Sequence, residues 1–151
     1  MKNKIWIVLL CLLSSCVAIP APELTATISP PSVLASADNE YRLQPGEETL
    51  TRSGVEISSV SLIERVELDP IRVEVNFLGS LPTTCNQLRL EVGLPDAQYR
   101  INIDAYSIVK TGPKCEQVLQ QFEASILLGV YSPGRYTVLV NGGAVGDFVV
   151  Y

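Results

Sequence analysis

The sequence contains no histidine among its 151 residues. This absence excludes nucleophile pairs of the Ser-His and Cys-His type, and it removes the side chain that most often binds metals through nitrogen. Structural zinc sites take their four ligands from closely spaced pairs of cysteine or histidine, and the four cysteines do not form two such pairs. A zinc site is therefore not predicted either. We therefore expect no catalytic residues, no metal and no other cofactor, and we expect that the protein is not an enzyme.

The chain also lacks an apolar run long enough to cross a membrane as a helix, which takes roughly 20 residues. Its longest run, Ile5–Leu13, is much shorter. Basic clusters are absent as well, because lysine and arginine are scattered singly and the formal net charge is −5. An acidic surface argues against nucleic acid as a partner and against electrostatic adhesion to anionic lipid.

The N-terminus has the layout of a secretory signal, with two lysines in Met1–Lys4 followed by the apolar run. That run ends in Leu13-Ser14-Ser15-Cys16, which resembles the lipobox of bacterial lipoproteins. The resemblance implies a signal peptide over residues 1–15, palmitate-type acyl chains on Cys16, and a mature protein anchored to a bacterial cell membrane on its extracytoplasmic side. Two or three acyl chains suffice for stable anchoring, whereas one chain is marginal. An ordinary secretory signal with a chance cysteine is the alternative.

Residues 16–54 read as a tether behind the lipidated cysteine. They are rich in proline, alanine, serine and threonine and show little hydrophobic periodicity. Such a composition buries too little apolar surface to offset the entropy lost on ordering. We expect Glu47 and Glu48 to be solvated charges, and we leave open that Tyr41–Leu50 packs on the following domain.

Residues 55–151 have the period-two alternation of strands that are buried on one face. Turn signals such as Asp69-Pro70 and Asn141-Gly142-Gly143 separate the alternating runs. No segment has a convincing helical period, so we expect an all-β domain of about seven strands. The first strand is expected in the less regular stretch Ile57–Leu68. In the other six, the alternate side chains that we expect to face inward run from Ile71 to Phe77, Leu88 to Val92, Tyr99 to Ala105, Phe122 to Leu128, Tyr136 to Val140, and Phe148 to Val150.

The stretch Pro133-Gly134-Arg135-Tyr136-Thr137-Val138-Leu139-Val140-Asn141-Gly142 resembles the end of bacterial immunoglobulin-like domains. The wider layout resembles small uncharacterised bacterial lipoproteins: a lipobox, a tether, paired cysteines and this ending. The resemblance implies an Ig-like antiparallel β-sandwich over about residues 55–151, and it says little about function. We expect Tyr136 to be a plain core tyrosine, in preference to one that makes a tyrosine-corner contact.

Cys85 and Cys115 remain as a pair once Cys11 is removed with the signal and Cys16 carries lipid. In an exported, oxidising setting such a pair predicts a disulfide, and two buried free thiols are the alternative. The bridge would close a loop of about 30 residues, which is worth roughly 3–4 kcal/mol in the chain-entropy model.

Candidate binding residues lie in the predicted turns. Pro82-Thr83-Thr84 resembles part of a loop of chagasin-like cysteine protease inhibitors, and Asn141-Gly142-Gly143 weakly resembles that family's glycine-rich loop. Tyr131 is an aromatic candidate for an exposed contact. Glu64, Glu67 and Asp69 could line a cation site, but we expect a solvated strand edge.

The leading hypothesis is therefore a membrane-anchored, non-enzymatic binding or structural module outside the cytoplasm. Its partner, beyond the membrane itself, would be an envelope or extracellular protein or a glycan. The alternatives are a chagasin-like cysteine protease inhibitor and a hydrolase with an unrecognised site. Ser107 and Lys110 have the spacing of a penicillin-binding enzyme motif, but an extended strand would place them on opposite faces.

Overall fold

The computed structural model describes residues 30–110, 112 and 115–151, and these residues form an all-β structure without a helix. The described part consequently has no helix long and apolar enough to span a membrane. The ten strands are β1 (Val33–Ala35), β2 (Thr51–Ser53), β3 (Glu56–Arg65), β4 (Arg72–Leu81), β5 (Asn86–Val92), β6 (Arg100–Val109), β7 (Gln120–Leu127), β8 (Val130–Tyr131), β9 (Gly134–Val140) and β10 (Gly143–Val150).

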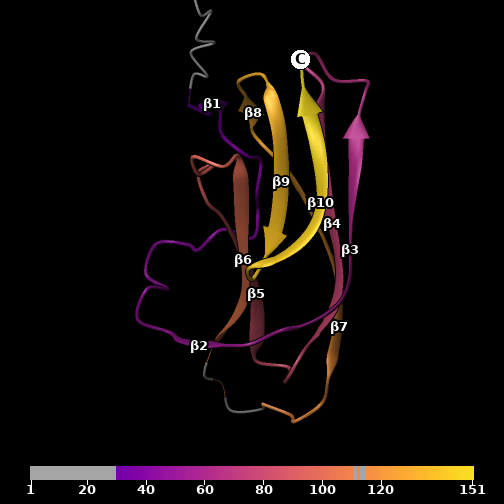
Figure 1. Ribbon diagram of the computed structural model, residues 1–151. Coiled ribbons are helices and arrows are strands. Elements are labelled where there is room, and N and C mark those ends of the chain that lie inside the picture. The colour runs from indigo at the N-terminus through magenta and orange to yellow at the C-terminus, as the bar shows by residue number, and fades with distance from the viewer. Residues whose placement is uncertain (1–29, 111, 113–114) are drawn as a thin grey trace, which may run out of the picture.

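The strands form a β-sandwich whose two main sheets face each other across one core (Figure 1). One sheet has the order β3-β4-β7, and the other contains β10, β9, β6, β2 and β5. A small third sheet pairs β1 with β8. The seven strands expected from the alternation are all present, as β3 to β7, β9 and β10. The three additional strands, β1, β2 and β8, are only two or three residues long.

The all-β sandwich is confirmed, but one strand pair departs from the expected antiparallel arrangement, because β6 and β9 run parallel. Strand β9 pairs with the first half of β6, from Arg100 to Ile103, and β2 pairs with the second half, from Ser107 to Val109. Two strands from distant parts of the chain therefore share one edge of β6. Local sequence patterns do not encode which edge a strand joins, so this pairing was not predicted.

The inward side chains are those that the alternation predicted. Val75, Phe77, Leu90 and Ile101 are fully buried, as is Tyr136. Exceptions occur at strand ends: Ile71 precedes β4 and is 60% exposed, and Tyr99 is only partly buried, with a positive φ of 60°.

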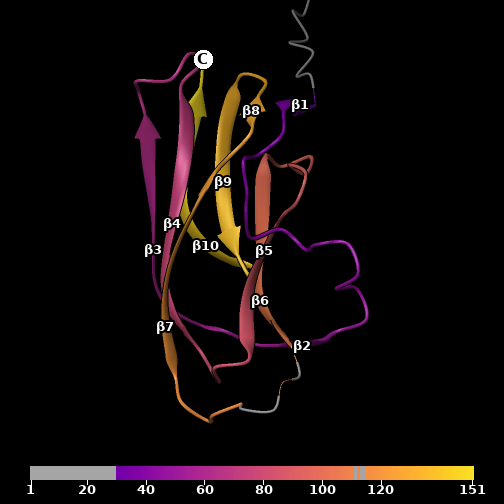
Figure 2. The ribbon, with the colours of Figure 1, turned by 180° about the vertical axis from the view of Figure 1, so that it is seen from behind.

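Residues 30–54 lie along the sandwich, so the packing that the sequence left open for Tyr41–Leu50 is observed, and the rest of this stretch is not the free tether that we expected. β1 pairs with β8, Asp38 bridges to Leu127, and the amide of Leu90 donates to the carbonyl of Tyr41. Strand edges carry unpaired backbone groups, and this segment satisfies several of them with its own backbone. Seen from behind, residues 36–50 form a loop on the side of the sandwich between β1 and β2 (Figure 2). The rest of the expected tether, residues 16–29, lies outside the described residues.

Candidate functional site

The disulfide between Cys85 and Cys115 is confirmed, with Cα atoms 5.3 Å apart. It joins the β4–β5 turn to the connection between β6 and β7. Two hydrogen bonds flank it, because Thr84 N donates to the Glu116 carbonyl and Glu116 N donates to Thr84 Oγ1. The candidate lipidation residue, Cys16, lies outside the described part of the chain.

In the turn Pro82–Thr84, both threonine hydroxyls form hydrogen bonds with other groups of the protein. Thr83 Oγ1 donates to Asn86 Oδ1 over 2.6 Å and accepts from the amide of Cys85. Thr84 Oγ1 accepts from Glu116 in the disulfide-linked connection. These hydroxyls therefore stabilise the turn instead of projecting toward a partner.

The second candidate loop also has a structural role. Asn141 adopts a positive φ of 49°, and its side-chain amide pairs with both backbone groups of Ala105, over 2.8 and 3.0 Å. The amide of Gly142 donates to Asn102 Oδ1. Asn141 thereby continues the pairing along β6 in the gap between β9 and β2. Gly143 follows as the first residue of β10.

The structure does not bring these two candidate loops to one rim. Asn86, which follows the Pro82–Thr84 turn, pairs with Val109, whereas Asn141 is bound to Ala105. The two contacts are four residues apart on β6, about 13 Å along an extended strand. Figure 1 agrees, with the β9–β10 turn well short of the end at which the 82–84 turn lies.

Tyr131 is not exposed, contrary to our expectation, because β8 places it in the core with 4% of its surface accessible. It belongs to an aromatic cluster in which its ring lies 5.1 Å from that of Tyr136 and 6.1 Å from that of Phe148. Tyr136 is fully buried, and its hydroxyl donates to the carbonyl of Ser132 over 2.8 Å. The expectation of a plain core tyrosine is therefore wrong, because this is a tyrosine-corner contact.

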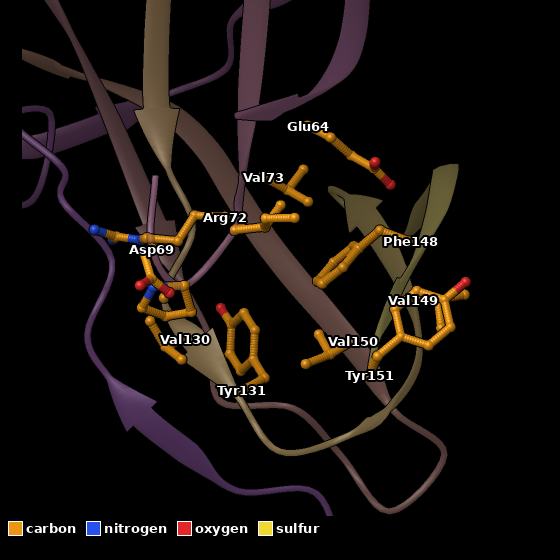
Figure 3. A pocket seen from close by; sticks show the side chains of 13 residues that line it. Glu64, Asp69, Arg72, Val73, Val130, Tyr131, Phe148, Val149, Val150 and Tyr151 are labelled. Carbon is orange, nitrogen blue, oxygen red and sulfur yellow. The ribbon is translucent and has the colours of Figure 1, made fainter. Parts of the chain in front are cut away.

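An apolar pocket opens beside this cluster, with a volume of about 310 Å³ (Figure 3). Its lining includes the buried side chains of Val73, Tyr131 and Phe148. The half-buried side chains of Val130 and Val150 lie beside them. Four segments that are far apart in sequence thus meet here: the end of β3 with the β3–β4 turn, the start of β4, β8, and the end of β10. All lie at the end of the sandwich that also holds β1 (Figures 1 and 2).

One wall of the pocket depends on a close backbone approach. A Cβ atom at Gly129 would collide with the carbonyl oxygen of Ala35. Glycine at this position therefore lets β1 lie against the β7–β8 connection. This contact, together with the pairing of Val33 with Tyr131, fixes β8 at the pocket.

The charges around the pocket are unbalanced. Arg72 contributes to the lining, but its guanidinium donates to the Leu128 carbonyl over 2.8 Å and to Asp38 over 2.7 Å. Figure 3 shows this group directed away from the pocket. Glu64 and Asp69 also line the pocket, and within the described ranges neither carboxylate has an ion-pair or hydrogen-bond partner. The net charge of the lining outside Arg72 is therefore negative.

A second charged cluster lies far from the pocket in the fold. Glu47 is buried, not solvated as we expected, and accepts two hydrogen bonds from Arg89, over 2.8 and 2.5 Å. Lys110 Nζ lies 2.9 Å from the same carboxylate. The bonds from Arg89, followed by those from Lys110 and the Gln44 amide, lower the pKa of Glu47 to about 2 against an opposing effect of burial. This cluster fastens residues 36–50 to the outer side of β5 and β6.

Tyr106 extends this charged surface along β6. Its hydroxyl donates to Glu91 over 2.8 Å, and the Arg52 guanidinium lies 4.2 Å from its ring centre. Burial, followed by the bond to Glu91, raises the pKa of Tyr106 to about 12.

A wider hollow of about 570 Å³ beside residues 36–43 has no aromatic side chain in its lining. Among residues 30–110, 112 and 115–151, no three metal-ligating side chains meet. The end pocket is therefore the candidate site.

Sequence reasoning missed this pocket. Glu64 and Asp69 were considered, but as solvated charges, and Val73 and Phe148 were assigned only to the core. Nothing local marks the four segments as neighbours. The unpredicted position of β8, fixed by residues of the expected tether, brings Val130 and Tyr131 to the site.

Comparison with known protein families gives a match over the second half of the chain. Residues 75–150, from within β4 to the end of β10, match the family described as the ORF11 beta-sandwich domain. No curated protein and no solved structure matches the chain. The matched residues cover half of the chain and include the Tyr131, Phe148 and Val150 side of the pocket. The chain therefore belongs to the ORF11 beta-sandwich domain family.

Proposed function

We propose that this protein is a lipid-anchored, non-enzymatic binding module on the extracytoplasmic side of a bacterial membrane, and that the end pocket is its ligand site. The observation that carries the binding role is an open, largely apolar pocket of about 310 Å³ with aromatic walls. Pockets of this kind are the usual sites of small-ligand recognition in proteins.

The anchoring role rests on Leu13-Ser14-Ser15-Cys16, whose order matches a lipobox behind a charged and apolar leader. The Cys85–Cys115 disulfide supports an oxidising compartment, because such bonds persist mainly in exported proteins. Together these two features favour a location outside the cytoplasm.

The position of the pocket fits these two roles. Its wall at Tyr131 pairs with Val33 in β1, close to the first described residue. Pro30 lies 14 positions after Cys16, and even a fully extended chain over that distance in sequence spans about 50 Å. The anchor would therefore keep the pocket within reach of the membrane surface, where ligands that partition into or leave the bilayer are concentrated.

The non-enzymatic part of the proposal rests on how the reactive side chains are used. Ser107 is buried and accepts a hydrogen bond from Asn86 over 2.7 Å, while Lys110 is paired with Glu47. Ser107 thus lies inside the sandwich, whereas the Lys110 side chain extends toward Glu47. The two residues therefore do not form a nucleophile with its base.

Metabolic labelling tests the anchoring. Cells that express the wild-type chain, Cys16→Ala or Cys11→Ala are grown with labelled palmitate and then fractionated. We expect label and membrane association for wild type and for Cys11→Ala, which keeps the proposed acceptor thiol. We expect neither for Cys16→Ala. Equal labelling of Cys16→Ala, or unlabelled wild-type protein in the soluble fraction, would refute the anchor.

A further inference from the structure

We infer that the end pocket binds a small organic cation with an apolar body, of the alkylammonium or arylalkylammonium class. This inference rests on the proposed role of the pocket as a ligand site and adds the chemistry of the ligand. It is carried by the combination of an apolar interior with two unpaired carboxylates at the opening.

The interior selects for an apolar body of limited size. Tyr131 and Phe148 present aromatic surface, and Val73, Val130 and Val150 present aliphatic surface. Apolar groups that move from water into such a site gain free energy in proportion to the area they bury. At about 310 Å³ the pocket lies at the lower end of the usual range for ligand sites, roughly 300–1,000 Å³. A ligand with one ring or a short alkyl chain would fit, whereas a sugar would find few polar partners in the interior.

The opening selects for positive charge. Figure 3 shows Glu64 on one side of the pocket and Asp69 on the other. Both side chains are exposed, and within the described residues neither is neutralised. The neighbouring cations are already committed: Arg72 binds Asp38, and Arg65 binds Glu67 over 2.6 Å and Glu74 over 2.8 Å. An ammonium group at the opening would be attracted by the negative charge of both carboxylates, and a carboxylate or phosphate would be repelled by it.

The aromatic walls add to the same preference. A cation placed over the face of a tyrosine or phenylalanine ring is attracted by the negative charge density of that face. Tyr131 and Phe148 both line the pocket, so a cationic head can interact with a ring while the carboxylates neutralise its charge from outside. A neutral ligand of the same shape gains the apolar contact and neither of these two electrostatic contributions.

A matched series of ligands tests the inference. 2-Phenylethylammonium, 2-phenylethanol and 3-phenylpropionate share one apolar body and differ in charge. Each is titrated into the complete mature chain with Cys16→Ser, which removes the acyl chains, and binding is followed by NMR of the Val130, Val150 and Phe148 side chains. We expect the ammonium ligand to bind roughly fivefold or more tightly than the alcohol, and the carboxylate to bind most weakly. Salt at 0.5 M should reduce the preference, because it screens exposed charges.

Two double variants locate the effect. Glu64→Gln/Asp69→Asn should bring the ammonium ligand to the affinity of the alcohol and leave the alcohol unchanged. Glu48→Gln/Glu123→Gln removes the same charge from exposed positions outside the pocket lining, and it should keep the preference. All four substituted side chains are exposed, so both proteins should fold, and near-ultraviolet circular dichroism checks this.

The outcomes separate the inference from the proposed function. If the alcohol binds as tightly as the ammonium ligand, or if the control variant loses the preference as well, the pocket is a ligand site but its cation selectivity is refuted. If none of the three ligands shifts the pocket resonances, the inference fails together with the assignment of this pocket as the ligand site.

Discussion

The carboxylate of Glu47 and the guanidinium of Arg89 form a buried, two-bond ion pair across 42 residues of sequence. Arg89 lies on β5, and Glu47 belongs to the segment that precedes β2. The pair therefore fastens the N-terminal segment to a strand that it otherwise touches mainly through Asn39 and Tyr41. Since β1 and β8 meet at the end pocket, the attachment of this segment also bears on the ligand site.

Glu47→Gln should loosen this attachment. The amide keeps the shape of the carboxylate but leaves the charges of Arg89 and Lys110 without their counter-ion, and a buried unpaired charge is costly. We expect a lower melting temperature and faster hydrogen exchange at the amide of Leu90, which donates to the carbonyl of Tyr41. Glu48→Gln is the control, because Glu48 is exposed and accepts only from the amide of Gly46. Equal effects of the two substitutions would contradict the buried pair.

Acid should destabilise the protein through the same residue. The pKa of Glu47 is about 2 in the folded protein, below its ordinary value of 4.5, because Arg89 and Lys110 bind the ionised form. As the pH falls, the unfolded chain takes up this proton first, so the stabilisation is present above about 4.5 and is lost progressively toward pH 2. Melting temperatures measured between pH 6 and pH 2 should converge for wild type and Glu47→Gln. A constant difference over this range would show that the Glu47 pKa is not lowered.

Removal of the disulfide should cost stability without changing the sheets. Cys85→Ala/Cys115→Ala releases a loop closed over 30 residues, and the expected loss in the free energy of unfolding is about 3–4 kcal/mol. Urea denaturation with and without reductant measures it. Reductant should lower the midpoint of the wild type to that of the double variant and should leave the double variant unchanged. A double variant as stable as the oxidised wild type would refute the contribution of this bond.

Substitutions at Asn141 separate its backbone role from its side-chain role. Asn141→Gly tolerates the positive φ but loses both hydrogen bonds to Ala105, so we expect a loss of about 1–2 kcal/mol. Asn141→Ala loses the same bonds and must also adopt the left-handed conformation, which adds about 1 kcal/mol. Chemical denaturation of both variants gives the order. If Ala and Gly are equally destabilising, or if neither is, the turn does not act as described.

Much of the fold could be predicted because each long strand has one buried face. The alternation from Val73 to Phe77 or from Leu88 to Val92 is a local consequence of that burial, and it predicted seven strands and most of the core. The disulfide could be predicted because it needs only two cysteines left in an oxidising compartment. The tyrosine-corner contact of Tyr136 was considered but not favoured. Its acceptor is the backbone carbonyl of Ser132, and the pattern of side chains in a sequence does not show where a backbone carbonyl will lie.

The remaining features depend on long-range pairing. Residues 30–54 are attached to the sandwich through backbone hydrogen bonds and several ion pairs, among them Asp38–Arg72 and Glu47–Arg89, so their low hydrophobicity wrongly indicated a free tether. Strand β8 is two residues long, too short for any alternation, and Tyr131 was therefore expected at the surface. The pocket could not be predicted for the same two reasons, because Glu64, Tyr131 and Val150 come together only when β8 and β10 are positioned in the fold.

The intact mass of the mature protein, extracted from a bacterial membrane fraction without reductant, is the decisive test of the proposed anchor at Cys16. It reports the first residue of the chain, the acyl groups and the oxidation state of the cysteines in a single measurement. We expect a chain that begins at Cys16, carries acyl mass on that residue, and is two hydrogens lighter than the fully reduced chain. A soluble, unmodified chain that retains residues 1–15, or one cleaved elsewhere without acyl mass, would contradict it.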